Sequence, residues 1–265
     1  MNDILAAEAK SKGNEINFTY GKKSGEAKGN ALTEKEEKKL RDEGFSVEFL
    51  GNGVSCVVSK EHTFGTDALL LSEFALPKNK DRCCDLGTGC GIIPLLWCRN
   101  ENIRNVTAVE IQEKGIEQLK KSIEISSLES RITPVHSDLK CLKGKVENCS
   151  FTLVTMNPPY TAKGAGIESA GEADKLARHE NACTFGDICS AAAKLLTYGG
   201  RLCMCIRPER LFELMNEMKK NKLEPKRLRL VSKCPGKAPW LALVEGRLSL
   251  RSGLTVMPEL FMESL

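Results

Sequence analysis

Apolar and polar positions divide the chain into a polar N-terminal segment and a longer region with regular apolar runs. Residues 1–42 mix Gly, Lys, Glu and Asn, and we expect residues 1–30 to be weakly ordered because they offer little apolar surface to bury. Residues 34–42 are dense in charges of both signs, which is compatible with a short solvent-facing helix. The pattern predicts a polar, flexible N-terminal extension over residues 1–42 and one domain over residues 43–265.

From residue 45 onward, the pattern alternates between strands and helices. Short apolar runs predict strands, and helical apolar spacing, as at Ile116, Leu119 and Ile123, predicts helices. The predicted strands are 46–50, 54–59, 82–85, 106–110, 132–135, 151–156, 201–206, 227–232 and 241–245, and the predicted helices are 92–99, 113–126, 187–196 and 209–220. This alternation is typical of a parallel α/β sheet with helices on both faces, which binds ligands outside the carboxyl ends of its strands.

Composition agrees with a water-soluble domain. The chain is 41% hydrophobic and 28% charged, and its 265 residues suit one domain with a small appendage. No apolar run approaches the roughly 18 residues that a membrane span needs, and the first residues lack the apolar core of a signal peptide. We therefore expect a cytoplasmic protein.

Twelve cysteines are unusual for such a chain. No CxxC pair occurs, so the sequence gives little support to a zinc ribbon or a redox motif, and we expect no metal. We interpret the cysteines as small buried apolar residues in a reducing compartment. The alternative is a metal or redox role for one pair, such as Cys203 and Cys205.

A glycine-rich turn, Asp85-Leu-Gly-Thr-Gly-Cys-Gly91, follows a predicted strand and opens a helix. Gly87, Gly89 and Gly91 allow a ligand to approach the backbone without interference from a Cβ. The spacing differs from the dinucleotide pattern GxGxxG, and the Gly-Lys-Ser/Thr ending of a phosphate-binding Walker loop is missing. The turn fits S-adenosylmethionine, which has no phosphate.

Acidic residues follow three successive predicted strands. Asp85 suits the cationic amino group of S-adenosylmethionine, and Glu110 ends the next strand, where a carboxylate can accept hydrogen bonds from ribose hydroxyls. Asp138 follows the third strand and could accept a hydrogen bond from the adenine amino group. Each signal alone is weak, but their order along the chain predicts a cofactor site.

The tetrapeptide Asn157-Pro158-Pro159-Tyr160 follows the predicted strand 151–156. Two prolines hold the backbone extended and rigid. The Asn157 side-chain oxygen and the Pro158 carbonyl can accept hydrogen bonds from a planar NH2 group and stabilise the positive charge that develops on its nitrogen during methyl transfer. Tyr160 can stack on the planar group. We predict Asn157, Pro158 and Tyr160 to be catalytic.

These motifs in this order resemble class I methyltransferases of the N6-adenine and N5-glutamine groups. Further segments resemble the bacterial tRNA1(Val) adenine N6-methyltransferase family, and the resemblance covers roughly residues 45–260. These further segments are Phe64–Leu71, Ala177–Glu180, Gly199–Arg201, Arg207-Pro208 and Pro225–Arg229.

The resemblance implies a Rossmann-like α/β fold, a seven-stranded mostly parallel sheet with a reversed last hairpin, and a monomer. It implies that S-adenosylmethionine is the cofactor and that residues 161–181 cover the acceptor pocket. It also adds residues to the expected cofactor site, which comprises Thr66, Asp67, Asp85, Gly87, Gly89, Gly91, Glu110, Ile111, Asp138, Leu139 and Asn157.

Charge is concentrated in the last third of the chain. Residues 194–251 contain fourteen Lys and Arg and five Glu, a net charge of +9, whereas the whole chain carries +4. This favours a polyanionic partner, whose phosphates Lys226, Arg227 and Arg229 could contact. The alternative is that these charges lie on solvated helix faces, which often look basic. We expect RNA, in particular tRNA, to be the partner.

Three alternatives to adenine N6-methylation of tRNA stay open at this point. A release-factor glutamine N5-methyltransferase shares the tetrapeptide, but such enzymes usually carry a helical N-terminal domain that residues 1–42 are too short and polar to form. Guanine N2-methylation of ribosomal RNA uses the same chemistry. A non-enzymatic RNA-binding protein on this fold would tend to lose the glycine turn or the tetrapeptide, and both are intact.

Overall fold

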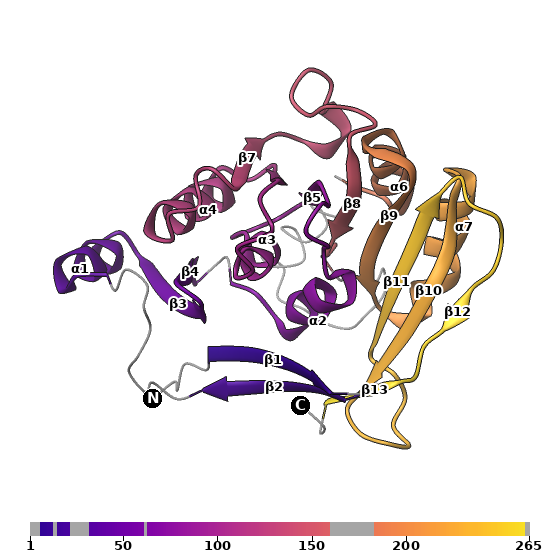
Figure 1. The fold of residues 1–265 in the computed structure, drawn as a ribbon, viewed down its shortest axis with the longest axis horizontal. Coiled ribbons are helices and arrows are strands. Elements are labelled where there is room, and N and C mark those ends of the chain that lie inside the picture. The colour runs from indigo at the N-terminus through magenta and orange to yellow at the C-terminus, as the bar shows by residue number, and fades with distance from the viewer. Residues whose placement is uncertain (1–5, 13–14, 22–31, 61–62, 160–182, 263–265) are drawn as a thin grey trace, which may run out of the picture.

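One mixed, mainly parallel β-sheet organises the molecule (Figure 1). The computed structural model describes residues 6–12, 15–21, 32–60, 63–159 and 183–262, with side chains described from residue 32 onward. The sheet order is β12-β10-β11-β9-β8-β5-β6-β7, and β13 also pairs with β10. The strands are β5 (Cys83–Leu86), β6 (Val106–Glu110), β7 (Ile132–His136), β8 (Phe151–Met156), β9 (Leu196–Ile206), β10 (Leu223–Ser232), β11 (Leu241–Leu248), β12 (Thr255–Val256) and β13 (Leu260–Phe261).

The sheet is mostly parallel and contains the reversed hairpin, as predicted. Strands β5 to β9 are parallel, and β11 runs antiparallel between β9 and β10. The sheet nevertheless has nine strands in the described residues instead of the expected seven. The chain after β11 returns along β10 and adds the two-residue strands β12 and β13. These pairings cover part of an edge that would otherwise expose unpaired backbone groups.

Helices cover both faces of the sheet. Helices α2 (Thr66–Ala75), α3 (Ile92–Cys98) and α4 (Glu113–Ile125) share one apolar core with one side of the strands. Helices α6 (Phe185–Leu195) and α7 (Leu211–Lys220) share a second core with the other side. Figure 1 shows these two groups flanking the strands. Neighbouring residues of one strand, such as Cys83 and Cys84, belong to different cores because successive side chains of a strand point to opposite faces.

The strands β3 (Phe45–Gly51) and β4 (Val54–Ser59) form a separate antiparallel pair. The sequence predicted both strands. It did not predict α2, which follows β4 and precedes the glycine turn. Residues 66–75 are apolar around most of the helix, since seven of the ten are buried, so amphipathic spacing is absent. A buried helix of this kind cannot be recognised from periodicity.

The boundary between α6 and β9 differs from the prediction by a few residues. The sequence predicted a helix to residue 196 and a strand from residue 201, whereas β9 already begins at Leu196. Leu196 is fully buried and pairs with Phe151, and the Thr197 hydroxyl donates a hydrogen bond to the Phe151 carbonyl at 3.2 Å. Gly199, at φ +72°, lies within β9.

The N-terminal segment contains more regular structure than expected. Helix α1 (Glu34–Asp42) confirms the predicted short helix, and a capping box between Thr33 and Glu36 begins it. Strands β1 (Ala6–Lys12) and β2 (Glu15–Gly21) form an antiparallel hairpin within the segment that we expected to be weakly ordered. Alternating Ile16, Phe18 and Tyr20 is a strand pattern that the polar composition conceals.

Most cysteines are buried, as predicted. The structure describes all twelve as free thiols, of which eight are buried: Cys56, Cys83, Cys84, Cys90, Cys98, Cys189, Cys203 and Cys205. Within the described residues, no group of His, Cys, Asp or Glu side chains could hold a metal ion. In the same part of the chain, no helix is both long and apolar enough to cross a membrane.

Candidate active site

The predicted motifs meet where three adjacent parallel strands end. The register pairs Asp85 with Thr155 and Leu86 with Met156, so the glycine turn after β5 lies beside Asn157 after β8. Met156 pairs in turn with Met204 of β9, which brings Cys205 to the same level. A ligand at this edge of the sheet would contact both motifs, as expected for an open α/β sheet.

The glycines of the turn have different tasks. Gly87, Gly89 and Gly91 all have positive φ, at +62°, +57° and +87°, where glycine alone is comfortable. A Cβ on Gly91 would lie 2.4 Å from Leu119 Cδ1 of α4, whereas a Cβ on Gly89 would meet no described atom within 4 Å. Gly91 therefore serves helix packing, while Gly89 faces open space that a ligand can occupy.

Glu110 holds the glycine turn in place. Its Oε2 accepts a hydrogen bond from Gly89 N–H at 2.8 Å, and its Oε1 accepts two from Ile111 N–H and Gln112 N–H at 2.8 Å each. Gly115 of α4 fits against this arrangement, since a Cβ there would lie 2.9 Å from Glu110 Cγ and 3.0 Å from the Gly89 carbonyl. The sequence analysis missed this role of Gly115, which a glycine inside a helical pattern could have indicated.

Asp85 is buried beneath the turn and is 1% exposed. Thr155 Oγ1 donates a hydrogen bond to Asp85 Oδ1 at 2.6 Å, and no lysine or arginine in the described part of the chain forms an ion pair with it. Burial raises the pKa of Asp85 to about 7, and the Thr155 hydrogen bond opposes this rise. A cationic group bound beside Asp85 would stabilise the carboxylate. The sequence analysis missed Thr155, which looks like an ordinary strand residue.

Other predicted cofactor residues lie along the ends of β6 and β7. Ile111 is exposed, and its carbonyl is 2.9 Å from His136 Nε2, which gives that histidine a structural partner. Asp138 caps a short 3-10 helix, η1 (Leu139–Cys141), by accepting a hydrogen bond from Lys140 N–H at 2.8 Å. Leu139 packs against the second core. Their contact with an adenine ring stays a prediction.

Asn157 lies between α2 and β9. Its Nδ2 donates a hydrogen bond to Asp67 Oδ2 at 2.9 Å, and Cys205 Sγ donates to its Oδ1 at 3.0 Å. Thr66 is the half-buried first residue of α2, and Pro158 is buried. Tyr160, together with the expected acceptor loop 161–181, lies outside the described residues. The sequence did not single out Cys205 for this position, because a buried cysteine in a strand reads as core.

The three basic residues expected at an RNA surface have different partners. Lys226 donates a hydrogen bond to the Arg251 carbonyl at 3.4 Å, whereas Arg227 and Arg229 lie near carboxylates. Arg227 is half-buried: it pairs with Glu245 Oε2 at 2.6 Å, donates to the Phe74 carbonyl at 2.9 Å and stacks over the Phe74 ring. Arg229 is half-buried and close enough to Glu73 for the two charges to interact. Arg227 thus has a partner within the fold that the charge pattern of the strand does not reveal, and its part in RNA binding stays a prediction.

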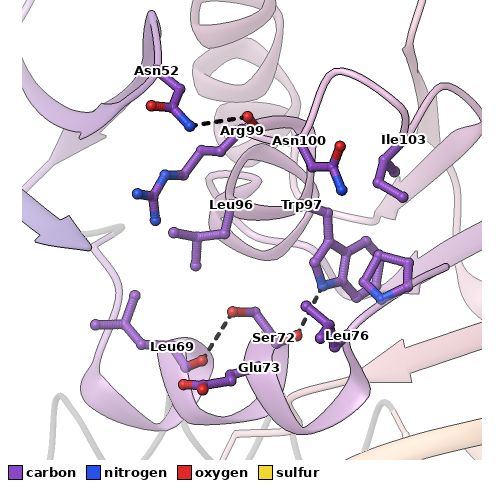
Figure 2. A pocket seen from close by; sticks show the side chains of 11 residues that line it. Asn52, Leu69, Ser72, Glu73, Leu76, Leu96, Trp97, Arg99, Asn100 and Ile103 are labelled. Atoms are coloured by element: carbon purple, nitrogen blue, oxygen red, sulfur yellow. Dashed lines mark hydrogen bonds between the residues drawn. The ribbon is translucent and has the colours of Figure 1, made fainter. Parts of the chain in front are cut away.

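A cavity of about 450 Å³ lies between α2 and α3, away from this edge (Figure 2). It is lined by residues near the C-terminal ends of both helices, including Glu73, Leu76, Trp97 and Arg99. Figure 2 shows Trp97 Nε1 donating to the Ser72 carbonyl, at 3.0 Å, on one wall. The motifs lie instead at the N-terminal ends of these helices, so the cavity is not part of the candidate active site.

The chain is similar in sequence and in fold to known methyltransferases. The chain is 29% identical over 146 residues to a tRNA1(Val) (adenine(37)-N6)-methyltransferase of Tolumonas auensis, which covers 55% of this chain and 59% of the relative. The chain thus spans less than two thirds of the length of this curated relative. A predicted O-methyltransferase from Agrobacterium tumefaciens has a similar fold, with a TM-score of 0.59, 22% identity, and coverage of 74% of this chain and 87% of that chain.

A second solved structure shares the fold over most of both chains. M. jannaschii TYW2, in complex with AdoMet, aligns with a TM-score of 0.52 and 13% identity over 91% of this chain and 92% of that chain. The fold is therefore the Rossmann-like fold of class I methyltransferases, as predicted. The family model described as "Methyltransferase small domain" matches residues 53–222, well over half of the chain. The chain belongs to the methyltransferase small domain family.

Proposed function

We propose that the protein is an S-adenosylmethionine-dependent N-methyltransferase that methylates the N6 nitrogen of an adenine in tRNA. One observation carries the proposal: the register of β5 and β8 brings the glycine turn and Asn157 side by side at the carboxyl edge of the sheet. A methyl donor at the turn and an acceptor nitrogen at Asn157 would then be neighbours, which methyl transfer requires.

The residues at the turn fit this cofactor. Asp85 is a buried carboxylate that forms no ion pair with a basic side chain in the described part of the chain, so a cationic amino group would supply the missing charge. The open space at Gly89 admits a ligand close to the backbone. Glu110, which also holds the turn, retains lone pairs that can accept ribose hydroxyls. Ile111, Asp138 and Leu139 would surround the adenine end.

The chemistry at the acceptor falls to Asn157 and Pro158. Bound S-adenosylmethionine would supply an electrophilic methyl group. An exocyclic NH2 group has its lone pair delocalised into the ring, so it must be held while its nitrogen becomes pyramidal. The Asn157 side-chain oxygen and the Pro158 carbonyl would accept its two hydrogens, and both would stabilise the positive charge that develops on the nitrogen. Tyr160 would stack on the base.

The choice of tRNA rests on the relatives and on charge. The Tolumonas auensis relative is named for methylation of adenine 37 in tRNA1(Val), and the same name recurs among other curated relatives. Exposed basic side chains remain in the region 194–251, among them Arg207, Lys233, Lys237 and Arg251. Arg227 is less available to this proposed surface than these side chains, because it is half-buried and paired with Glu245. We also propose that the protein acts in the cytoplasm and as a monomer.

The test is transfer of labelled methyl groups by purified protein. Unmodified total tRNA, ribosomal RNA and a release factor are each incubated with radiolabelled S-adenosylmethionine, with the Asn157→Ala variant in parallel. Label recovered as N6-methyladenosine from tRNA, and lost in the variant, is the expected result. Label only in guanine of ribosomal RNA or only in the release factor would overturn the proposed substrate, and label in none would overturn the proposed activity.

A further inference from the structure

The side chain of Asn157 is held from two sides by residues far apart in the sequence. Asp67, the second residue of α2, accepts a hydrogen bond from Nδ2 at 2.9 Å. Cys205, near the end of β9, donates its thiol hydrogen to Oδ1 at 3.0 Å. The two contacts thus grip opposite ends of one amide group.

These partners distinguish the two orientations of the amide. A carboxylate only accepts hydrogen bonds, so Asp67 can pair with the NH2 end and not with the oxygen. A thiol can donate its hydrogen to the oxygen, whereas its sulfur is only a weak acceptor for the NH2 end. Rotation of the amide by 180° would put the oxygen against the carboxylate and leave the NH2 end with only this weak acceptor, so both contacts favour the same orientation.

We propose that Asp67 and Cys205 are positioning residues that fix the plane and the orientation of the Asn157 amide, so that Oδ1 is presented to the acceptor amine. This inference rests on the proposed function. A carbonyl oxygen has two lone pairs, so Oδ1 can accept a hydrogen from the thiol and another from an amine. The carboxylate at Nδ2 also polarises the amide, which makes Oδ1 a stronger acceptor for a nitrogen that gains positive charge.

Gly65 leaves the space that Asp67 needs. A Cβ on Gly65 would lie 2.5 Å from Asp67 Oδ1. The backbone of Gly65, at φ −107°, suits any residue, so alanine would fit there without backbone strain. Gly65→Ala therefore displaces the Asp67 carboxylate while the carboxylate itself is kept.

The decisive experiment compares cysteine variants in steady-state methyl transfer. Cys205→Val removes the donor at similar volume, and Cys205→Ser keeps a donor. Cys203→Val is the matched control, because Cys203 lies two residues away on β9, is also fully buried and contacts Glu245 instead of Asn157. We expect kcat to fall about 10-fold in Cys205→Val, with KM for S-adenosylmethionine unchanged, and to recover to within about 3-fold in Cys205→Ser. Equal kcat values for Cys205→Val and Cys203→Val would overturn the proposal.

A double-mutant cycle tests the Asp67 side. Gly65→Ala and Asp67→Asn should each lower kcat, and the combined variant should be no slower than Asp67→Asn, because Gly65→Ala acts only through the carboxylate. Additive losses would contradict that route. A rise in KM for S-adenosylmethionine with unchanged kcat in Asp67→Asn would assign Asp67 to cofactor binding and overturn its positioning role.

A readout independent of activity separates this inference from the proposed function. With asparagine labelled by nitrogen-15, the side-chain NH2 signal of Asn157 is identified by its loss in Asn157→Ala. We expect this signal to shift in Cys205→Val and in Asp67→Asn and to stay in place in Cys203→Val. Such shifts in a protein that methylates no acceptor would support the held amide and count against the proposed function. A signal that no variant moves would overturn the positioning role even if the enzyme is active.

Discussion

Asp85 and Glu245 are both buried carboxylates of the central sheet, at 1% and 0% exposure, yet their surroundings are opposite. Glu245 is surrounded by guanidinium groups: Arg227 at 2.6 Å, Arg247 at 2.8 Å and Arg201 at 3.9 Å. Asp85 has a hydroxyl partner, Thr155, and no basic one in any ion pair of the described chain.

The pKa values of the two groups follow from this difference. Burial raises the pKa of Asp85 to about 7. Burial also tends to raise the pKa of Glu245, but hydrogen bonds and charge interactions with Arg247 and Arg227 outweigh it, so the pKa of Glu245 is lowered. Removal of a buried carboxylate whose counter-charges are within the fold leaves those charges unpaired and destabilises the fold, whereas a buried carboxylate that lacks a counter-charge is suited to bind a cation.

Of the variants that test this comparison, Glu245→Gln should have the largest effect, which is a loss of stability. The substitution leaves three arginines facing a neutral side chain, so we expect the free energy of unfolding to fall by about 3–5 kcal/mol. Urea unfolding measures it. Glu213→Gln is the control, because its ion pair with Arg210 is between neighbouring residues of an exposed surface and contributes at most about 1 kcal/mol. If both variants lose the same stability, Glu245 does not have the structural role described here.

Asp85→Asn should instead impair cofactor binding. Loss of a charged hydrogen-bond partner, about 1.5–3 kcal/mol, predicts that the affinity for S-adenosylmethionine falls roughly 10- to 100-fold in calorimetric titrations. Stability of the ligand-free protein at pH 8 should not fall, because the variant no longer buries an uncompensated charge. A variant that unfolds as readily as Glu245→Gln would remove the distinction between the two carboxylates.

The pH dependence of the two groups has opposite signs. Because the folded-state pKa of Asp85 is raised, its contribution favours folding most at low pH and is lost as the pH rises towards 7. Because the pKa of Glu245 is lowered, its contribution is present above the unfolded value and is lost as the pH falls through the lower folded value.

Because the pKa of Asp85 is raised to about 7, affinity for S-adenosylmethionine should rise with pH up to about 7 and then level off. Below that pH, binding of the cofactor should release a proton. Calorimetry in buffers of different ionisation enthalpy measures both. Burial also raises the pKa of Glu73 to about 7, so the Glu73→Gln variant is the control. Affinity that does not vary between pH 6 and 8 in this variant would contradict the assignment to Asp85.

The smallest expected effect comes from Thr155→Val. The Thr155 hydroxyl stabilises the charged form of Asp85, so its removal should move the midpoint of the affinity–pH curve upward by about 0.5–1 unit. The same calorimetric series detects it. Thr152→Val, on the same strand, is the control because its hydroxyl donates to Asp81 and not to Asp85. A midpoint that moves equally in both variants would exclude a specific role for Thr155.

The sequence predicted most strand segments along the chain and the glycine turn, because these depend on local patterns. Apolar runs such as 151–156 and glycines at 87, 89 and 91 have their meaning within a few residues. The tetrapeptide could be placed at a strand end for the same reason.

Contacts between distant residues could not be read in this way. Cys205 and Asp67 meet Asn157 because β8 and β9 end, and α2 begins, at one edge of the fold, and nothing in their own segments indicates that contact. Arg227 was assigned to an RNA surface because charge was visible in the sequence, whereas its burial against Glu245 depends on the register between β10 and β11.

The distribution of the cysteines makes the protein a reporter of its own unfolding. Eight of the twelve thiols are buried, and four are at least partly accessible: Cys141, Cys149, Cys183 and Cys234. A thiol-reactive dye should therefore label few sites in the native state and many after the cores open. The rate at which the buried thiols are labelled follows the population of open molecules. The buried thiols come from both faces of the sheet, so mass mapping of the labelled peptides would show which face of the domain loosens first.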